Sequence, residues 1–254
     1  MLKYYALNQT VEGILGMANN HAEHLEIEEK VELSIEDLQR MFKKYKEQAV
    51  GEITVKSHPR HYYDTKELEL RENKISMRIE CNEDGTFVQT IKFPEPNKDG
   101  HKVVKEIEDE VETASPSFSA IDDKDAKQRM SEFNESGLRH LYTTNVPAPK
   151  FFLDVELQDG RQGRVEISFD VGEIYLSSKY QVKYGCFERV PVCEIEVEYV
   201  SGDIEAIDLI IAEILSECPS ASTITKGKGS RGASLYKDAR AKHNAQKTIS
   251  CLKK

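Results

Sequence analysis

The sequence lacks the features that mark disulfide-rich, exported or membrane-spanning proteins. It has five cysteines, an odd number with no CxxC pair, which suits reduced thiols better than a disulfide framework. Its longest apolar run, residues 207–212, is too short and too charged at its flanks to cross a membrane. The first residues hold no basic region followed by an apolar stretch, so we expect no signal peptide. These absences predict a cytoplasmic protein without a membrane partner.

Two further absences narrow the class of ligand. Residues 226–230 are rich in glycine and lysine, but the spacing G-x-x-x-x-G-K-[ST] of a phosphate-binding P-loop is absent. The formal net charge of -10 argues against a nucleic-acid partner. It leaves open an anionic ligand that is held in a local basic pocket.

The chain is long enough for one large domain or for a domain with appendages. Its 254 residues are 39% hydrophobic, which is enough for a core, and 31% charged with both signs mixed. We divide it into an N-terminal extension over residues 1–24, a domain over residues 25–236, and a basic tail over residues 237–254.

Periodicity and turn residues predict a mixed α+β chain with many strands. We expect strands at residues 25–33, 53–63, 75–81, 86–93, 103–111, 151–157, 164–171 and 193–199. We expect helices at residues 11–18, from the cap Ser34 onward, at 123–133, from 201–203 to Pro219, and over part of 226–254. Residues 94–100 and 113–120 read as loops, and residues 142–149 as an extended linker.

The first expected strand separates charge from apolar residues. Because alternate residues of a strand point to the same side, Glu26, Glu28 and Lys30 share one face. Ile27 and Val31 lie on the opposite, apolar face. Taken alone, three alternating charged residues are typical of a strand face that is exposed to solvent, since charged residues are mostly exposed.

The same pattern recurs on later strands with both signs of charge, which favours convergence of the charged faces. The residues that would join the first strand are Arg78, Glu80, Lys92, Glu106, Glu108, Lys150, Asp154, Arg164, Glu166, Ser168, Asp170, Glu194, Glu196 and Glu198. Many antiparallel strands with one charged face each predict a closed β-barrel with a charged lumen, covered outside by helices. A salt bridge of Arg78 to a neighbouring carboxylate, and exposure of one or two of the last three glutamates, remain alternatives.

A lumen that mixes carboxylates with cations favours a metal–polyphosphate ligand. Carboxylates side by side repel one another unless a cation intervenes, and Mg²⁺ prefers oxygen ligands including phosphate. Lysine and arginine neutralise the remaining phosphate charge, arginine by bidentate hydrogen bonding.

These segments resemble the CYTH domain, the family of triphosphate tunnel metalloenzymes. Glu26-x-Glu28-x-Lys30 is similar to the family's ExExK signature at its first strand. The other segments, in the family's order, are residues 61–65 (HYYDT), 75–79 (ISMRI), 90–92 (TIK), 166–173 (EISFDVGE), 194–198 (EIEVE) with 201–203 (SGD), and 228–232 (KGSRG). Each motif alone is weak, whereas the ordered set is specific and covers residues 25–236.

The resemblance implies an eight-stranded antiparallel tunnel that binds a triphosphate-containing small molecule with Mg²⁺ or Mn²⁺. By analogy, the metal candidates are Glu26, Glu28, Glu194 and Glu196. The implied phosphate-binding residues are Lys30, Arg78, Lys92, Lys150, Arg164, Lys228 and Arg231. Glu28 and Lys30 are the implied catalytic pair, with Lys30 positioning or activating the nucleophile.

The implied activity is hydrolysis of inorganic or nucleoside triphosphate, with a homodimer as one possible assembly. Adenylyl cyclase activity of the class IV type and non-catalytic binding of polyphosphate or a nucleotide are the alternatives. Non-catalytic binding is an alternative because the sequence departs from the family pattern. Glu80 stands where a second arginine is usual, Lys150 follows Ala148-Pro149 in place of a basic-x-basic strand, and Val104 or Lys105 replaces an arginine.

Overall fold

The structure is a computed structural model that describes residues 24–252, so the helix expected at residues 11–18 lies outside the described range. The strands are β1 (His24–Glu32), β2 (Val50–Lys56), β3 (Arg60–Asp64), β4 (Ser76–Cys81), β5 (Phe87–Lys98), β6 (His101–Val111), β7 (Arg139–Asn145), β8 (Ala148–Glu156), β9 (Gln162–Leu176), β10 (Val190–Gly202) and β11 (Ser222–Thr223). The helices are α1 (Ile35–Lys46), α2 (Glu69–Glu72), α3 (Lys124–Met130), α4 (Ser178–Tyr184), α5 (Glu205–Glu217) and α6 (Lys228–Leu252), with a short 3₁₀ turn at Glu135–Gly137.

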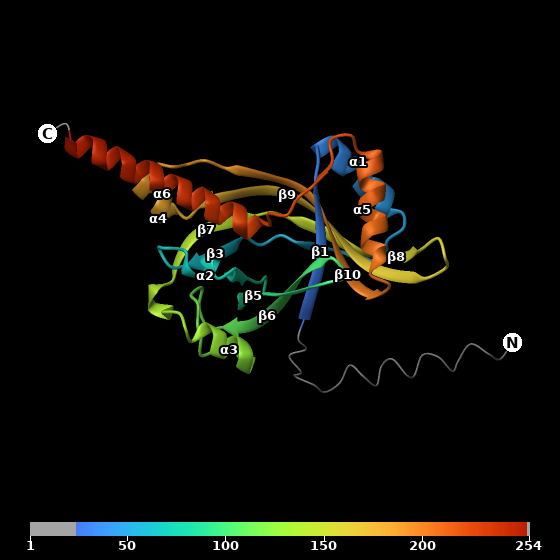
Figure 1. Cartoon of the computed structure of the whole chain (residues 1–254), viewed down its shortest axis with the longest axis horizontal. Helices are drawn as coiled ribbons and strands as arrows, with labels where there is room; N and C mark the ends of the chain where they lie inside the picture. The colour runs from blue at the N-terminus through green and yellow to red at the C-terminus, as the bar shows by residue number, and fades with distance from the viewer. Residues whose placement is uncertain (1–23, 253–254) are drawn as a thin grey trace.

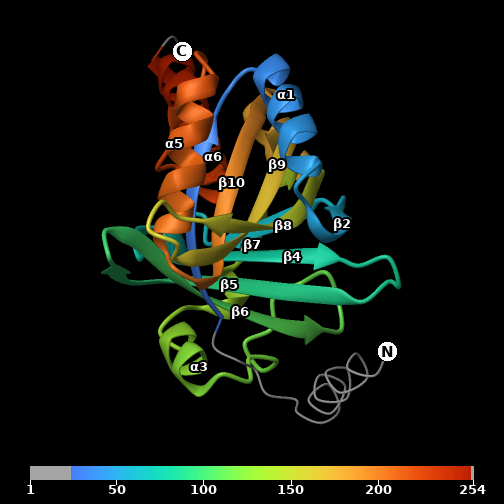
Figure 2. The same ribbon diagram turned by 90° about the vertical axis from the view of Figure 1, so that its right-hand side faces the viewer.

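The strands close into an antiparallel barrel, as the charge alternation predicted (Figures 1 and 2). The strand order runs β10-β1-β6-β5-β4-β3-β7-β9, and β9 pairs in turn with β10, which closes the ring. β2 and β8 continue the sheet beyond β9, and the two-residue β11 pairs with β1. Because β2 with β3 and β7 with β8 each act as one interrupted strand, the ring is an eight-stranded barrel.

Both interruptions fall at prolines. The expected single strand at residues 53–63 breaks before Pro59, since proline has no N–H for the ladder, and β2 and β3 flank the break. The linker expected at residues 142–149 is wrong: β7 and β8 occupy it and are separated only by Val146 and Pro147. β3 pairs with β7, and β2 pairs with β8, so the two breaks lie side by side.

The loop expected at residues 94–100 is also wrong, because β5 continues through it to Lys98. β4 pairs with β5 only up to Lys92, so beyond that point β6 is the one strand among the described residues that pairs with β5. Pro94 and Pro96 therefore lie where β5 is an edge strand, the place in a sheet that tolerates proline. The chain turns at Asp99 and Gly100 instead, both of which have positive φ.

The sequence predicted a strand that ends at residue 171, before Gly172. In the structure Gly172 lies inside β9, which continues to Leu176. A Cβ at this position would overlap the carbonyl oxygen of Asn145 and would lie 2.7 Å from the Cα of Val146. Only glycine lets β9 pass this close to the break between β7 and β8.

The largest apolar core lies outside the barrel wall. The outward residues of β1, β8, β9 and β10, among them Ile27, Phe169 and Ile195, pack against α1 and α5. Ser34 caps α1 as expected, since its side chain accepts a hydrogen bond from the backbone N–H of Asp37. Figure 2 shows α1 and α5 standing against the same region of the barrel.

Two smaller cores are formed elsewhere on the barrel. The outward side of β4–β6 packs against α3, and β7 and β9 pack against α4 and α6. The basic C-terminal region is helical, as expected in part, and α6 runs without a break across residues 236 and 237. Between residues 24 and 252, none of the helices combines the length and the apolar character needed to cross a bilayer. With helices packed on the apolar outside, charge is left to fill the interior.

Candidate active site

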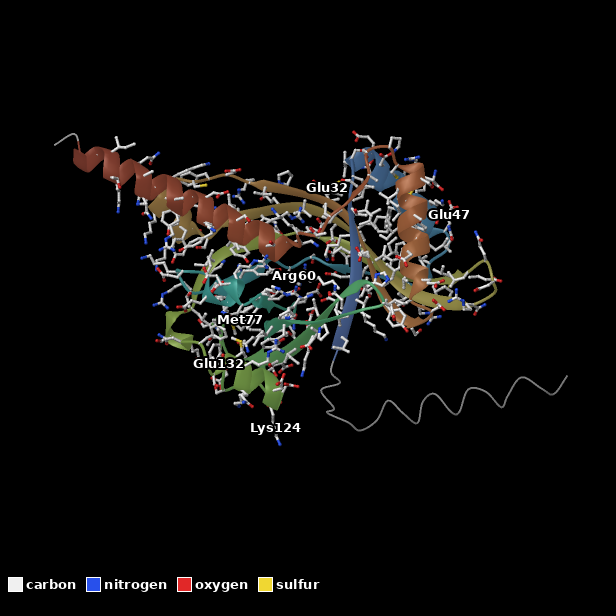
Figure 3. All side chains as sticks on the ribbon, viewed as in Figure 1. Glu32, Glu47, Arg60, Met77, Lys124 and Glu132 are labelled. Carbon is white, nitrogen blue, oxygen red and sulfur yellow. The ribbon has the colours of Figure 1, made fainter. Side chains whose placement is uncertain are left out.

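The inward faces of the strands enclose a lumen of about 1240 Å³. Many of the charged residues that the sequence singled out line it, namely Glu26, Glu28, Lys30, Arg78, Lys92, Lys150, Glu196 and Lys228. Figure 3 draws all side chains of the described residues on the ribbon. The structure thus brings together ionic side chains from separate strands.

One ion-pair group joins β1, β4, β5 and β6. Lys92 pairs with Glu26 and lies 2.5 Å from Glu106 Oε2, and Arg78 donates to Glu106 over 3.3 Å. Burial raises the pKa of Glu26 to about 7, and Lys92 opposes this shift only in part. Burial also acts on Glu106, but Lys92 and Arg78 outweigh it and hold its pKa well below the usual range. The Nε of Arg78 is buried without a hydrogen-bond partner.

A second group joins β1, β10 and the start of α6. Lys30 Nζ lies 2.5 Å from Glu28 Oε2 and donates to Glu196 Oε1 over 2.5 Å. Lys228 donates to the same oxygen of Glu196 over 2.5 Å. Despite burial, the two neighbouring carboxylates raise the pKa of Lys30, which therefore remains protonated at neutral pH.

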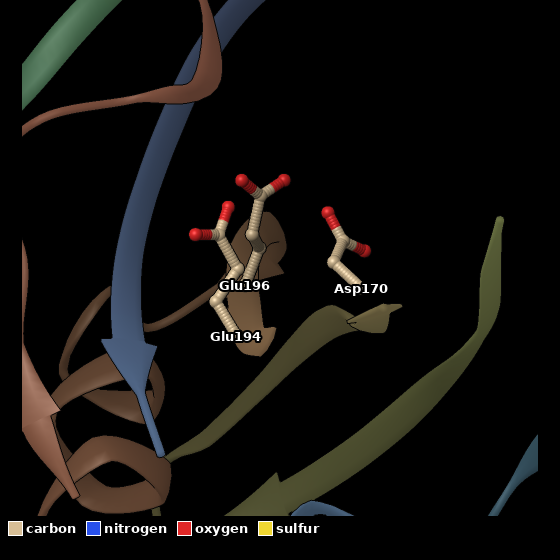
Figure 4. A group of neighbouring side chains, drawn as sticks. All are labelled: Asp170, Glu194 and Glu196. Atoms are coloured by element: carbon tan, nitrogen blue, oxygen red, sulfur yellow. The ribbon is translucent and has the colours of Figure 1, made fainter. Parts of the chain in front are cut away.

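Asp170, Glu194 and Glu196 form an acidic triad (Figure 4), and Lys228 pairs with all three. One oxygen of each triad residue lies within 4.8 Å of the others. Lys228 pairs with Asp170 and lies 2.8 Å from Glu194 Oε1. That oxygen of Glu194 is buried and accepts no hydrogen bond of normal geometry. Arg231 pairs with the other oxygen of Glu194 and does not itself line the lumen.

A third region of the lumen, around Glu166 and Glu198, has more carboxylates for each cation than the two ion-pair groups. Lys150 donates to both oxygens of Glu166, over 2.7 and 2.8 Å. Glu198 lies opposite Glu28 on β1 and Glu166 on β9, and among residues 24–252 it forms no ion pair with a lysine or arginine. Burial, together with Glu26, Glu28 and Glu166, raises the pKa of Glu198 to about 8.

Arg164 is a second expected phosphate-binding residue, after Arg231, that does not line the lumen. It shares its strand face with Glu166 but lies nearer to the β8–β9 turn, where its side chain is 42% exposed. It forms a bidentate pair with Asp154, over 2.6 and 3.0 Å. Alternation along the strand predicts the face correctly, but it does not show where the lumen ends.

α6 carries Lys228 into the lumen because its first turn packs closely on the barrel. The Tyr142 hydroxyl donates to the carbonyl oxygen of Gly229 over 2.7 Å. A Cβ at Gly232 would overlap the ring of Tyr142, so glycine is required for this approach. The ring of Tyr142 also stacks on Tyr62 at 4.9 Å between centroids. The glycines of the KGSRG segment therefore serve packing, which places Lys228 among the carboxylates.

Two lumen residues were missed as site candidates. Asp170 was placed on an inward face but not among the metal candidates, although period-two alternation with Ser168 and Glu166 contained the signal. Arg60 was not singled out, because Pro59 obscures the phase of the short strand β3. It lines the lumen and pairs with Glu80.

The acidic triad fits a hard divalent cation such as Mg²⁺ or Mn²⁺. Its donors are carboxylate oxygens that lie close together, and Glu194 Oε1 is a buried acceptor without a hydrogen bond. Of the expected metal candidates, Glu194 and Glu196 belong to this triad, whereas Glu26 belongs to the Lys92 group. Glu28 is next to the triad, because Lys30 pairs both with Glu28 and with the triad residue Glu196.

A known structure shares this fold, and a second one is similar at a lower score. A Bacillus halodurans protein described as an adenylate cyclase candidate is 18% identical, with a TM-score of 0.52 over 82% of this chain and 97% of that chain. A Hippeastrum protein, described as an adenylyl cyclase candidate with a dominant triphosphatase activity, is 19% identical, with a TM-score of 0.48 over 82% of this chain and 95% of that one. No curated protein matches the sequence.

Sequence comparison assigns the family directly. Residues 24–228 match the CYTH domain, which is most of the chain and includes the barrel strands and Lys228. The ordered motifs and the closed barrel agree with this match. The chain therefore belongs to the CYTH domain family.

Proposed function

We propose that this protein hydrolyses a triphosphate, either inorganic triphosphate or a nucleoside triphosphate, with Mg²⁺ or Mn²⁺. The observation that carries the proposal is the interleaving of cations and carboxylates in one lumen. Lys30, Lys92 and Lys228 each lie between carboxylates of different strands. A polyphosphate with its metal presents the same alternation of charge, so it can replace these internal pairs without leaving a buried charge alone.

In this proposal the lumen cations bind phosphate oxygens. Lys30, Lys92, Lys150 and Lys228 supply ammonium donors, and Arg78 supplies a guanidinium whose Nε is buried without a partner. A phosphate oxygen would give that Nε an acceptor. Arg231 acts through Glu194, and Arg164 has no role because it lies outside the lumen.

The acidic triad, with Glu28 beside it, would hold the divalent cation, which when bound supplies charge neutralisation to the phosphates. Lys30 remains protonated and donates to an oxygen of the terminal phosphate. Glu28 Oε2, 2.5 Å from Lys30 Nζ, is the proposed acceptor of a proton from the attacking water. The water oxygen then bonds to the terminal phosphorus. At the same time the bond between that phosphorus and the bridging oxygen breaks, and the bridging oxygen leaves with the rest of the phosphate chain.

Charge balance in the lumen supports a second candidate, binding without turnover. Lys30, Arg60, Arg78, Lys92, Lys150 and Lys228 are each paired with at least one carboxylate. A ligand must compete with these carboxylates, which lowers its net gain on binding. Cytoplasmic location and a possible homodimer remain predictions of the sequence.

Release of phosphate from tripolyphosphate and from ATP, measured with each divalent metal in turn, tests the proposal. The expected result is metal-dependent phosphate release by the wild type that is lost in Glu28→Ala. Tight binding by calorimetry without any product favours the binding reading, and cyclic AMP with pyrophosphate from ATP favours a cyclase. Absence of both binding and turnover contradicts the proposal.

A further inference from the structure

Arg60 and Glu80 form a partly buried pair that the family resemblance does not explain. They lie directly opposite each other on β3 and β4, and Arg60 Nε donates to Glu80 Oε2 over 3.0 Å. Arg60 is 9% exposed and lines the lumen, and Figure 3 labels it near the centre of the molecule. Arg60 therefore belongs to the wall of the proposed site, with Glu80 as its partner on the neighbouring strand.

The hydrogen bonding of Arg60 is incomplete in a specific way. Within residues 24–252, Nε is the only nitrogen of its guanidinium that has a hydrogen-bond partner. The two terminal nitrogens have no partner within that range but are not buried, and Arg60 lines the lumen. They are therefore accessible from the lumen. The side chain is thus fixed at its base and presents free N–H donors at its tip.

The other buried lumen cations differ from Arg60 in this respect. Lys30, Lys92 and Lys228 each place their single nitrogen among two or three carboxylate partners. Arg78 uses a terminal nitrogen for Glu106. A ligand must displace carboxylates from the three lysines and must share Arg78 with Glu106, whereas the terminal donors of Arg60 are available without any rearrangement.

We propose that Arg60 binds phosphate oxygens of the ligand through its two terminal nitrogens, with Glu80 as the residue that positions it. This inference rests on the proposed function. Guanidinium forks bind two oxygens of one phosphate in parallel, and a side chain that is already held in place loses less conformational entropy on binding. Glu80 accordingly supports phosphate binding, although its charge is opposite to that of the arginine common at this position in the family.

The decisive variant replaces both members of the pair, Arg60→Gln with Glu80→Gln. It leaves the net charge of the lumen unchanged and leaves no buried charge without a partner, so it separates a binding role from a purely stabilising ion pair. Calorimetry of the full chain with tripolyphosphate and Mg²⁺ supplies the affinity, and thermal unfolding verifies the fold. We expect affinity to fall by about 10- to 100-fold, the loss for charged hydrogen bonds. Arg189→Gln, which breaks an exposed pair with Glu173, is the matched control and leaves affinity unchanged.

Two single variants test the parts of the inference. Arg60→Lys keeps the charge but loses the fork, and it is expected to weaken binding nearly as much as the double variant. Glu80→Ala is expected to weaken binding, whereas a Glu80 that merely repels the anion would make the same variant bind more tightly. Glu80→Gln retains an oxygen for Arg60 Nε and is expected to keep most of the affinity.

The outcomes separate this inference from the proposed function. If the wild type binds tripolyphosphate and the double variant binds it equally well, the role of Arg60 is overturned while the proposed function stands. Tighter binding by Glu80→Ala overturns the positioning role. If the wild type binds no tripolyphosphate with any divalent metal, both the inference and the proposed function are overturned.

Discussion

Replacing Lys228 by methionine tests whether the acidic triad is held together by a cation. The ammonium of Lys228 contacts all three triad carboxylates, and the side chains of Asp170 and Glu194 are 3% and 0% exposed. Methionine keeps the length and the apolar stem of the side chain but removes the charge. The variant therefore leaves buried carboxylates short of one positive partner.

The expected cost follows from the partners that remain. Glu196 keeps Lys30 and Glu194 keeps Arg231, but Asp170 keeps only the hydroxyl of Ser168, which donates over 2.9 Å. Removing one partner of a buried ion pair costs about 3–5 kcal/mol, and the remaining partners place this case near the lower end. We expect the free energy of unfolding of Lys228→Met in metal-free buffer to fall by about 3 kcal/mol.

A divalent cation should restore much of that loss. A metal at 100 times its dissociation constant stabilises the native state by about 2.7 kcal/mol, which is close to the expected deficit. In the wild type the metal must compete with the ammonium, so the same Mg²⁺ concentration should stabilise the wild type less than Lys228→Met.

Urea unfolding with and without Mg²⁺ measures both effects. Lys226→Met is the matched control, because Lys226 lies two residues away and is exposed, and it should change neither quantity. A loss below about 1 kcal/mol in Lys228→Met would refute the electrostatic reasoning. Equal stabilisation of variant and wild type by Mg²⁺ would refute competition between Lys228 and the metal.

Three other variants have direct physical expectations. Gly172→Ala places a Cβ against the backbone of Asn145 and should lower the free energy of unfolding by about 3 kcal/mol, whereas Gly137→Ala meets only ordinary contacts of 3.5 Å or more; equal urea midpoints would contradict this. Asp64→Asn weakens acceptance from three backbone N–H groups around α2 and should cost about 1–2 kcal/mol in the same assay; an unchanged free energy of unfolding would contradict this. Glu198 has a folded pKa raised to about 8, so the native state binds more protons than the unfolded chain from about pH 4.5 to 8, and its contribution to stability falls as pH rises through that window. Glu198→Gln should flatten the fall in melting temperature between pH 5 and 8, and an unchanged slope would contradict the shift.

The barrel and its charged lumen could be predicted because alternation is a local property of strands. Glu26, Glu28 and Lys30 show it within five residues, and the same period places Glu194 and Glu196 on one face. The apolar residues that alternate with these charged ones predicted an outer apolar core. The structure has this core, because α1 and α5 cover the outward side of β1 and β10. Recurrence over several strands supplied the information that a single strand lacks.

The errors arose where tertiary structure overrides local signals. Pro94 reads as a loop residue, but an edge strand accepts proline, and which stretch of β5 is an edge depends on where β4 ends. Gly172 reads as a strand end, but it is required by the close approach of Asn145. Arg164 has the right phase but lies past the end of the lumen. Each outcome depends on where other strands start and stop, which the sequence of one strand does not contain.

A crystal structure with Mn²⁺ and tripolyphosphate tests the central claim most directly. The account predicts the anion inside the barrel with its oxygens on Lys30, Arg78 and Lys92, and an anomalous Mn²⁺ peak beside Glu196. An anion bound only on the outer surface, with the internal ion pairs of the lumen intact, would contradict it.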